Sequence, residues 1–421
     1  MKNLKFKFLK SFCAGLGLVV SIFSPESGDA ALTGGRFNPT AHPLDAFCSV
    51  NNPSGIVEVP DQIDLGFRWY NMDKEADYMG NTIPGANGKY TVSAKPNWFF
   101  YEGAVNKKFT LDTCWGCWDV AVGLYSYNSP TSIRGSYNRP IPIAGNQPIE
   151  LEVWHQRTGP VFAVKLNECH SIGVSIDFNV FRVNIKGLEF FDNSFGSVSP
   201  GFVTDKGHEA DLTVRPSLGW LWHINEKWTF GAKFSPYTPF TMKRYKGFFA
   251  RHGRASTPNE LTIALHCEVN SKLSGGIEVE WVNFKDTVLN HPLLFPNGNF
   301  RTLGSDQGAS IGWQDAFFIS TGGAYKFTDC FTTNVAYIYR TRRIPHSQTF
   351  FNSISIRAPE NILAVGFTYK FCDKNDIAML YTHGFEKEIK GRNSIPAFAG
   401  GGEVNIKGSN NTLGVTLGHK F

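Results

Sequence analysis

The last ten residues constrain the fold of this chain more than any other stretch, because they alternate between apolar and small or polar side chains. One face of this segment carries Leu413, Val415, Leu417 and Phe421. The strands of outer-membrane β-barrels have this pattern, in which the apolar face meets lipid and the closed ring leaves no free edge. An amphipathic strand of a soluble sandwich has the same pattern, so this segment alone leaves both folds open.

The N-terminus predicts export. Four lysines within residues 2–10 precede an apolar stretch over 12–23, which is too short to span a bilayer as a helix. Small residues at 28–30 suit a signal peptidase, so we expect a signal peptide over 1–30. The alternative is a membrane anchor. No other apolar run approaches the roughly 20 residues of a transmembrane helix.

Short polar turns and long Gly- and Pro-rich loops alternate along the rest of the chain, as they do at the two rims of an outer-membrane barrel. We therefore predict an all-β fold, a transmembrane antiparallel β-barrel with an N-terminal plug. Fourteen strands are expected, near 62–72, 92–104, 118–127, 148–167, 170–187, 209–222, 227–243, 258–269, 272–285, 314–326, 331–342, 358–371, 375–386 and 403–421. An even number places both chain ends at the periplasmic rim.

Period-2 alternation is cleanest over 172–180, 212–222 and 363–371, whose apolar faces we expect to point toward lipid. The pattern changes phase near Gly159: Leu151 and Val153 are odd-numbered, whereas the apolar residues after Gly159 are even-numbered. We interpret this change as a β-bulge, which adds one residue to the strand.

Residues 31–60 contain four prolines and do not alternate. We expect a plug inside the barrel, with a disordered tail as the alternative. The predicted organisation is therefore a signal peptide over 1–30, a plug over 31–60 and the barrel over 61–421.

Several short motifs resemble the FadL/TodX family of outer-membrane transporters. Residues 45–55 are similar to the family's plug, with Asn52, Pro53, Ser54 and Gly55 at its Asn-Pro-Ala motif and the following Gly, and with Ser in place of Ala. Residues 216–222 resemble the family's Pro-Ser-Leu-Gly strand, and 279–284 its Val-Glu-Trp segment. The order and spacing of the motifs carry the likeness over nearly the whole mature chain.

This resemblance implies a channel in the outer membrane of a Gram-negative bacterium that takes up long-chain fatty acids or similar hydrophobic molecules. Substrate would be captured at extracellular loops and would leave sideways where a strand is kinked. Membrane lipid and, through the C-terminal strand, the outer-membrane assembly machinery are the implied partners. Two other hypotheses remain: a general diffusion porin, and a disulfide-cross-linked structural envelope protein.

No catalytic constellation or cofactor motif is found, so we expect neither an enzyme nor a cofactor. We also expect no metal, because Cys114 and Cys117 lack a second ligand pair. The net charge of +5 is too weak to indicate nucleic acid.

Alternation places several charged residues on the lumenal face. A fatty-acid carboxylate entering an apolar passage needs a partner, since burying it alone is costly. The candidates are Lys165, Arg215, Lys233 and Arg340. Lumenal charges also brace barrels by pairing with one another, for which Glu278 and Glu280 are available.

Seven cysteines follow residue 30, and an odd number in an exported chain leaves a thiol free or shared with another chain. Most lie in or beside short turns or in the plug. We hypothesise that they cross-link to neighbouring envelope proteins or tie the plug to the wall; small buried thiols are the alternative. The candidates are Cys48, Cys114, Cys117, Cys169, Cys330 and Cys372.

Overall fold

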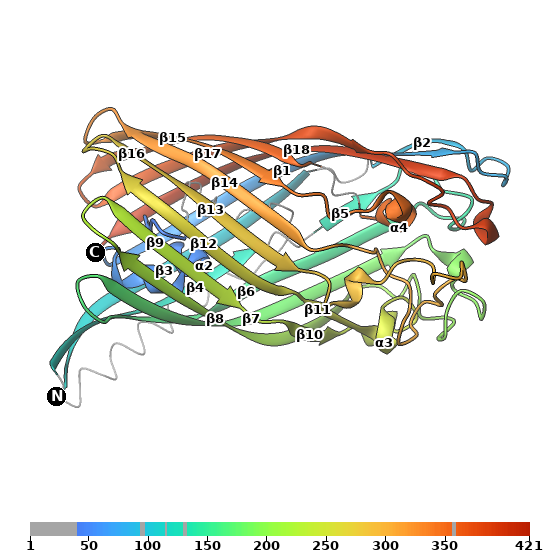
Figure 1. Cartoon of the computed structure of the whole chain (residues 1–421), viewed down its shortest axis with the longest axis horizontal. Coiled ribbons are helices and arrows are strands. Elements are labelled where there is room, and N and C mark those ends of the chain that lie inside the picture. The colour runs from blue at the N-terminus through green and yellow to red at the C-terminus, as the bar shows by residue number, and fades with distance from the viewer. Residues whose placement is uncertain (1–39, 93–96, 114–115, 129–132, 356–358) are drawn as a thin grey trace.

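The computed structural model describes residues 40–92, 97–113, 116–128, 133–355 and 359–421. Within these residues fourteen antiparallel strands form a closed ring, in which β18 pairs with β1 from Gln62↔Lys420 to Met79↔Glu403. Figure 1 shows the short turns gathered at one end of the barrel and the long loops with their short helices at the other. We call these the short-turn end and the long-loop end.

The ring consists of β1 Gln62–Met79, β3 Asn97–Thr113, β4 Gly116–Asn128, β6 Glu150–Lys165, β7 His170–Lys186, β8 Glu209–His223, β9 Trp228–Ser235, β12 Asn259–Glu268, β13 Leu273–Asn283, β14 Ala316–Lys326, β15 Phe331–Arg340, β16 Asn361–Cys372, β17 Asn375–Ile389 and β18 Glu403–Lys420. Each corresponds to one expected strand, so the predicted fold class and strand order are confirmed.

Short elements lie outside the ring. The strands are β2 Gly88–Thr91, β5 Ile133–Ser136, β10 Thr238–Thr241 and β11 Arg254–Thr257. The helices are α2 Cys48–Asn51, η3 Pro53–Val57, η4 Glu189–Phe191, η5 Lys243–Tyr245, α3 Ala250–Gly253, η6 Val288–Asn290, η7 His346–Gln348, α4 Thr349–Asn352 and η8 Ala397–Ala399. Among the described residues, none of the helices has the length and apolar character needed to cross a membrane.

The exterior of the ring is apolar, as alternation predicts. Leu212 and Leu218 on β8 are each 59% exposed, whereas Arg215 and Ser217, which face the lumen, are buried. The same alternation runs through β7, β16 and β18. An apolar outer face over a polar lumenal one is the arrangement of a barrel in lipid, so the fold is that of an outer-membrane β-barrel.

The predicted β-bulge near Gly159 is wrong. The register between β6 and β7 is the same on both sides of Gly159, at Thr158↔Phe178 and at Val161↔Ser175. On its other edge, β6 pairs continuously with β4 through this point. Leu151 and Val153 are odd-numbered because they face the lumen, which is itself apolar at the long-loop end.

Two strand lengths also differ from expectation. β1 continues beyond the expected end at residue 72 to Met79, and this additional part pairs with β18 and β2. β9 ends at Ser235, short of the expected residue 243. The carbonyls of Ser235 and Pro236 turn to accept hydrogen bonds from Arg215, so the chain leaves the ring there.

Residues 40–60, which we call the inner segment, are mostly buried and contact lumenal residues of the wall. Of the predicted plug, 31–39 lie outside the described residues, as does the whole predicted signal peptide. Apolar side chains of the inner segment pack with the wall in one cluster, which includes Phe47, Ile56 and Tyr125.

Candidate functional site

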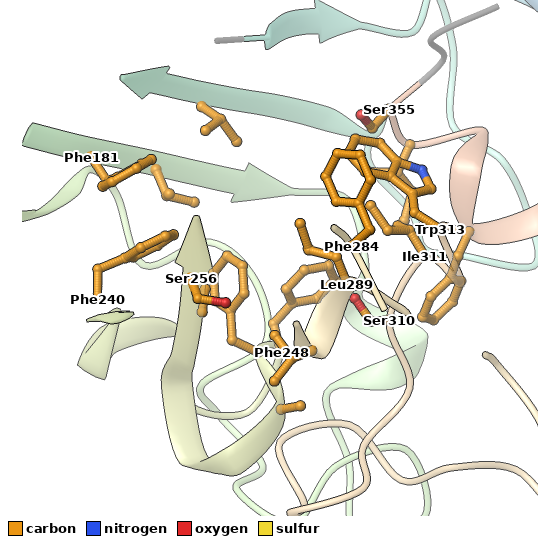
Figure 2. Close-up of a pocket in the computed structure, with 18 of the residues that line it drawn as sticks. Phe181, Phe240, Phe248, Ser256, Phe284, Leu289, Ser310, Ile311, Trp313 and Ser355 are labelled. Carbon is orange, nitrogen blue, oxygen red and sulfur yellow. The ribbon is translucent and has the colours of Figure 1, made fainter. Parts of the chain in front are cut away.

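An apolar cavity of about 150 Å³ lies inside the long-loop end of the barrel (Figure 2). Its wall comes from inward positions of β6 and β7, namely Leu151, Val153, Phe181 and Val183. Segments between ring strands supply the rest. The principal contributors are Phe240 on β10, Phe248, Phe249, Phe284, Leu289 on η6, Ile311, Trp313 and Phe351 on α4.

Stacked aromatic rings fix one side of the cavity. The rings of Phe181 and Phe240 lie 4.0 Å apart at 8°, and His155 stacks on the other face of Phe181 at 3.9 Å. On the opposite side, Phe284 meets Trp313 edge-on at 5.0 Å. Such pairs hold aromatic rings in defined positions, so the packed rings define the shape of the cavity.

The polar groups near the cavity are few and mostly satisfied. Trp313 Nε1 donates a 2.7 Å hydrogen bond to Asn352 Oδ1, and His155 Nε2 lies 2.7 Å from Asn179 Oδ1. Serine and threonine are the polar side chains that line the cavity, and no charged side chain is among its described lining residues. The arrangement suits an uncharged apolar molecule.

From the cavity toward the short-turn end, the lumenal side chains of β7 change from apolar to polar. Phe181 and Val183 are followed toward the short-turn end by Asn179 and then by Asp177, which is fully buried. Asp177 pairs with Arg157 and accepts a hydrogen bond from Tyr125. A belt of buried ion pairs therefore follows the apolar cavity.

Two further pairs belong to this belt. Arg215 Nη1 lies 3.1 Å from Glu260 Oε2, and Arg68 pairs with Glu102. Removing one partner of a buried ion pair is strongly destabilising, because the other charge is left buried without it. The belt is therefore a polar, braced layer on the lumenal side of β1, β3, β6, β7, β8 and β12.

The inner segment comes next along the same strands, and its seat requires glycine in the wall. A Cβ atom at Gly173 of β7 would lie 2.4 Å from Ser54 N, and one at Gly219 of β8 would lie 2.0 Å from Asn52 Oδ1. Any other residue at either position would displace the inner segment. Gly219 belongs to the Pro-Ser-Leu-Gly motif of the sequence.

The Asn52–Gly55 motif forms the turn that seats the segment. Asn52 Oδ1 accepts hydrogen bonds from Ser54 N at 3.2 Å and Ser54 Oγ at 2.7 Å, and Pro53 opens the helical turn of η3. Asn52 Nδ2 donates to the carbonyls of Thr40 at 2.9 Å and Trp220 at 3.0 Å. One side chain thus caps the turn and attaches it to the wall.

Glu58 closes the segment at its other end. It accepts a hydrogen bond from Ser171 Oγ, and its Oε2 lies 3.6 Å from His223 Nε2. Burial alone would raise the pKa of Glu58, but the hydrogen bonds with His223 and Ser171 outweigh it and hold the pKa below its usual value.

The four cationic candidates do not gather at the cavity. Arg215 donates to the carbonyls of Pro236, Ser235 and Pro258 as well as to Glu260. Lys233 donates to the Val50 carbonyl at 2.7 Å, and Lys165 pairs with Glu168 at 3.0 Å. The contacts of Arg215 brace the wall and that of Lys233 holds the inner segment, whereas Lys165 pairs locally with an exposed residue of the adjoining turn.

Arg340 lies at the long-loop end of β15, where its guanidinium stands over the Phe318 ring at 5.6 Å. It lines a small hollow with Glu360 and Ile389, apart from the apolar cavity. Of the predicted lumenal acids, Glu278 accepts a 2.6 Å hydrogen bond from Thr40 N and so also holds the inner segment.

The candidate cysteines are free thiols wherever the structure describes them. Cys48 is buried in the inner segment, where burial raises its pKa. Cys117, Cys169 and Cys330 are exposed near the short-turn end, and Cys267 is half-buried. Cys114 and the side chain of Cys372 lie outside what the structure describes.

Sequence reasoning missed the cavity residues. Phe181 and Val183 continue an alternating strand but on its inward face, and Phe240, Trp313 and Phe351 come from loops. The aromatic-rich loops were the available signal. A contact between two histidines was also not predicted: His42 of the inner segment stacks on His266 of β12 with ring centroids 3.7 Å apart.

Comparison with known proteins shows the class to which this fold belongs. No protein-family model matches the sequence, and no curated protein matches it. Solved structures of outer-membrane hydrocarbon channels do share the fold. The sequence's resemblance to the FadL/TodX family is therefore confirmed at the level of the fold.

Two toluene transporters and a FadL homologue are among the solved structures that share the fold. The Pseudomonas putida toluene transporter TodX has 13% identity and a TM-score of 0.64, covering 94% of this chain and 99% of TodX. The Ralstonia pickettii toluene transporter TbuX has 12% identity, a TM-score of 0.64, and coverage of 94% and 98%. A Pseudomonas aeruginosa FadL homologue has 14% identity, a TM-score of 0.63, and coverage of 95% and 99%.

Proposed function

We propose that this protein is an outer-membrane channel for small, uncharged hydrophobic molecules of about the size of one aromatic ring. The observation that carries the proposal is the apolar cavity inside the long-loop end. In other proteins, dry cavities of about this volume lined by aliphatic and aromatic side chains bind benzene. Two of the structures that share the fold are described as toluene transporters.

A long-chain fatty acid is the second candidate, supported by the sequence motifs and by the fold shared with a FadL homologue. The cavity favours it less. A carboxylate would lose its water in a space whose described lining offers no charged partner, and that desolvation is costly. Arg215 and Lys233 are already bonded to the wall and to the inner segment, and Arg340 lies apart from the cavity.

The proposed route enters from the long-loop end and leaves through the wall. A straight path down the lumen meets the ion-pair belt and then the inner segment, both of which would repel or obstruct an apolar molecule. The described pairing of β6 with β7 is interrupted between Thr158 and Val161, where Pro160 lacks an N–H. This weakened pairing lies at the level of the Arg157–Asp177 ion pair, and the backbones of β6 and β7 stay in contact there, so a sideways exit at this point requires the two strands to separate beside the belt.

Uptake by an expressing host tests the proposal, with labelled toluene and labelled oleate as substrates. Val183→Trp should fill the cavity and reduce toluene uptake at least tenfold. Val180→Trp is the matched control, because Val180 is on the same strand but on the lipid-facing side, where it should change uptake little. Equal loss in both variants would contradict a role for the cavity.

Bilayer conductance separates the channel from a diffusion porin. We expect low conductance, because the belt and the inner segment narrow the lumen. A steady, large conductance together with no uptake of either substrate would favour the porin.

A further inference from the structure

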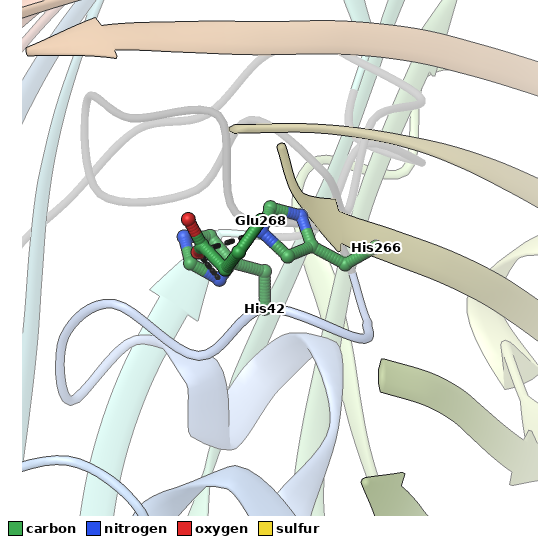
Figure 3. A group of neighbouring side chains, drawn as sticks. All are labelled: His42, His266 and Glu268. Atoms are coloured by element: carbon green, nitrogen blue, oxygen red, sulfur yellow. Dashed lines mark hydrogen bonds and ion pairs between the residues drawn. The ribbon is translucent and has the colours of Figure 1, made fainter. Parts of the chain in front are cut away.

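A cluster of three metal-binding side chains joins the inner segment to the wall near the short-turn end (Figure 3). His42 comes from the inner segment, His266 lies on β12, and Glu268 ends that strand. Their nitrogen and carboxylate ligand atoms all lie within 4.8 Å of one another. His266 is only 4% exposed and His42 is half-buried, whereas Glu268 is exposed, so the two imidazoles are the part of the cluster that packing holds in place.

The distances are close to those of a metal site. His266 Nε2 lies 3.1 Å from Glu268 Oε1, and His42 Nδ1 lies 4.0 Å from the same oxygen. Ligand atoms around a tetrahedral zinc ion are about 3.4 Å apart, given bonds of roughly 2.0–2.1 Å. The His266–Glu268 pair, now joined by a hydrogen bond, is close to this separation. His42 needs a side-chain rotation that takes its ring, now at 10° to that of His266, out of the stack.

The donor set and the surroundings favour ligation. The stacked rings of His42 and His266 place two imidazoles beside one carboxylate, and imidazole and carboxylate are common metal ligands in proteins. A cavity of about 280 Å³ adjoins the cluster and offers space for water as a further ligand.

The charges around this cavity limit the choice of ion. Lys272, Lys326, Lys370 and Lys420 also line it, with Asp376. Their charges disfavour any divalent cation, and Mg²⁺ and Ca²⁺, which bind oxygen ligands, have only the carboxylate of Glu268 in the cluster to offset that repulsion. Two imidazoles and one carboxylate instead suit Zn²⁺ and its transition-metal neighbours.

We propose that His42, His266 and Glu268 bind a zinc-type divalent ion that pins the inner segment to β12. The two imidazoles come from parts of the chain that are far apart in sequence, so an ion shared between them would cross-link the segment and the wall. Binding would then oppose movement of the inner segment, as ligand binding stabilises the state that holds the site.

Metal titration of the full chain in detergent, without a histidine tag and after chelation, tests the site. Co²⁺ should bind one ion per chain with visible absorption bands typical of four or five ligands, and Zn²⁺ should displace it. His42→Ala and Glu268→Gln should each weaken binding at least tenfold. His208→Ala is the matched control, because His208 Nε2 also lies 3.3 Å from a carboxylate, that of Glu152, but outside the cluster.

Absence of stoichiometric Co²⁺ binding, or binding unchanged in His42→Ala, would overturn the site. His42 lies outside the ring of strands, and retained heat-modifiability shows that the variant barrel is folded. Zn²⁺ should also lower wild-type conductance and leave that of His42→Ala unchanged. Binding without any effect on conductance would overturn the pinning. The spectroscopic measurement does not depend on the proposed transport function, so the two can fail separately.

Discussion

Lys233 of β9 donates a 2.7 Å hydrogen bond to the carbonyl oxygen of Val50, so a wall strand holds the inner segment through its backbone. Lys233 and Val50, which supply the donor and the acceptor, are both buried. Loss of a buried partner costs about 1–3 kcal/mol. This contact, with those of Asn52 and Glu58, makes the seating of the inner segment sensitive to single substitutions.

Lys233→Met should loosen the inner segment while leaving the ring of strands folded. We expect the conductance in planar bilayers to rise in Lys233→Met, as it should in a variant that lacks residues 31–60. Heat-modifiability should be retained in both. Lys227→Met is the control, because Lys227 is exposed in a short turn. If conductance is unchanged both in Lys233→Met and in the deletion, the segment does not obstruct the lumen.

Acid should release the segment through Glu58. Its pKa in the folded protein is below the usual value near 4.5, so its contribution to stability is complete above that pH and is lost as the pH falls through the lower, folded value. Conductance should therefore rise on acidification below about 4.5. Glu58→Gln should raise conductance at neutral pH and reduce the acid response, whereas Glu226→Gln in an exposed turn should do neither. A full acid response in Glu58→Gln would show that other groups control release.

Arg215→Leu should destabilise the barrel rather than alter substrate choice. The substitution leaves Glu260 without its ion-pair partner, and breaking a buried pair costs about 3–5 kcal/mol. We expect lower thermal stability, with uptake of oleate and toluene falling by similar factors. A selective loss of oleate uptake would instead support the carboxylate-binding role predicted from sequence. Arg340→Leu gives the same comparison for the second arginine.

Exposed thiols at the short-turn end predict cross-linking. Cys117, Cys169 and Cys330 are free and accessible, and exposed thiols in an oxidising compartment form disulfides. Non-reducing gels of intact envelopes, alkylated before lysis, should show higher-mass species that reducing agent removes. Serine at all three positions should abolish them. A monomer alone in the wild type would end the cross-linking hypothesis and leave the transport proposal intact.

The sequence predicted the ring of strands well because alternation reports directly which face of a strand meets lipid. The alternating positions of Leu212 and Leu218 indicated one apolar face on their strand. The short turns between consecutive strands indicated which strands pair. The interior was harder to predict. At Leu151 and Val153 an apolar residue faces inward, and alternation alone cannot distinguish an apolar lumen from a shift of phase.

The cavity and the metal-binding cluster were beyond sequence reasoning for a different reason. Phe181 and Phe240, and likewise His42 and His266, meet only because separate segments fold back into the same lumen. Their spacing in the chain carries no local period. The motif around Asn52 was recognisable because a turn needs only neighbouring residues.

A crystal structure of the full chain soaked with 4-bromotoluene shows directly whether the apolar cavity binds a small aromatic molecule. We expect an anomalous bromine signal inside the cavity between Phe181 and Trp313, and loss of that signal in Val183→Trp. Bromine bound only outside this cavity at saturating concentration, or a brominated fatty acid occupying it where 4-bromotoluene does not, would contradict the proposed function.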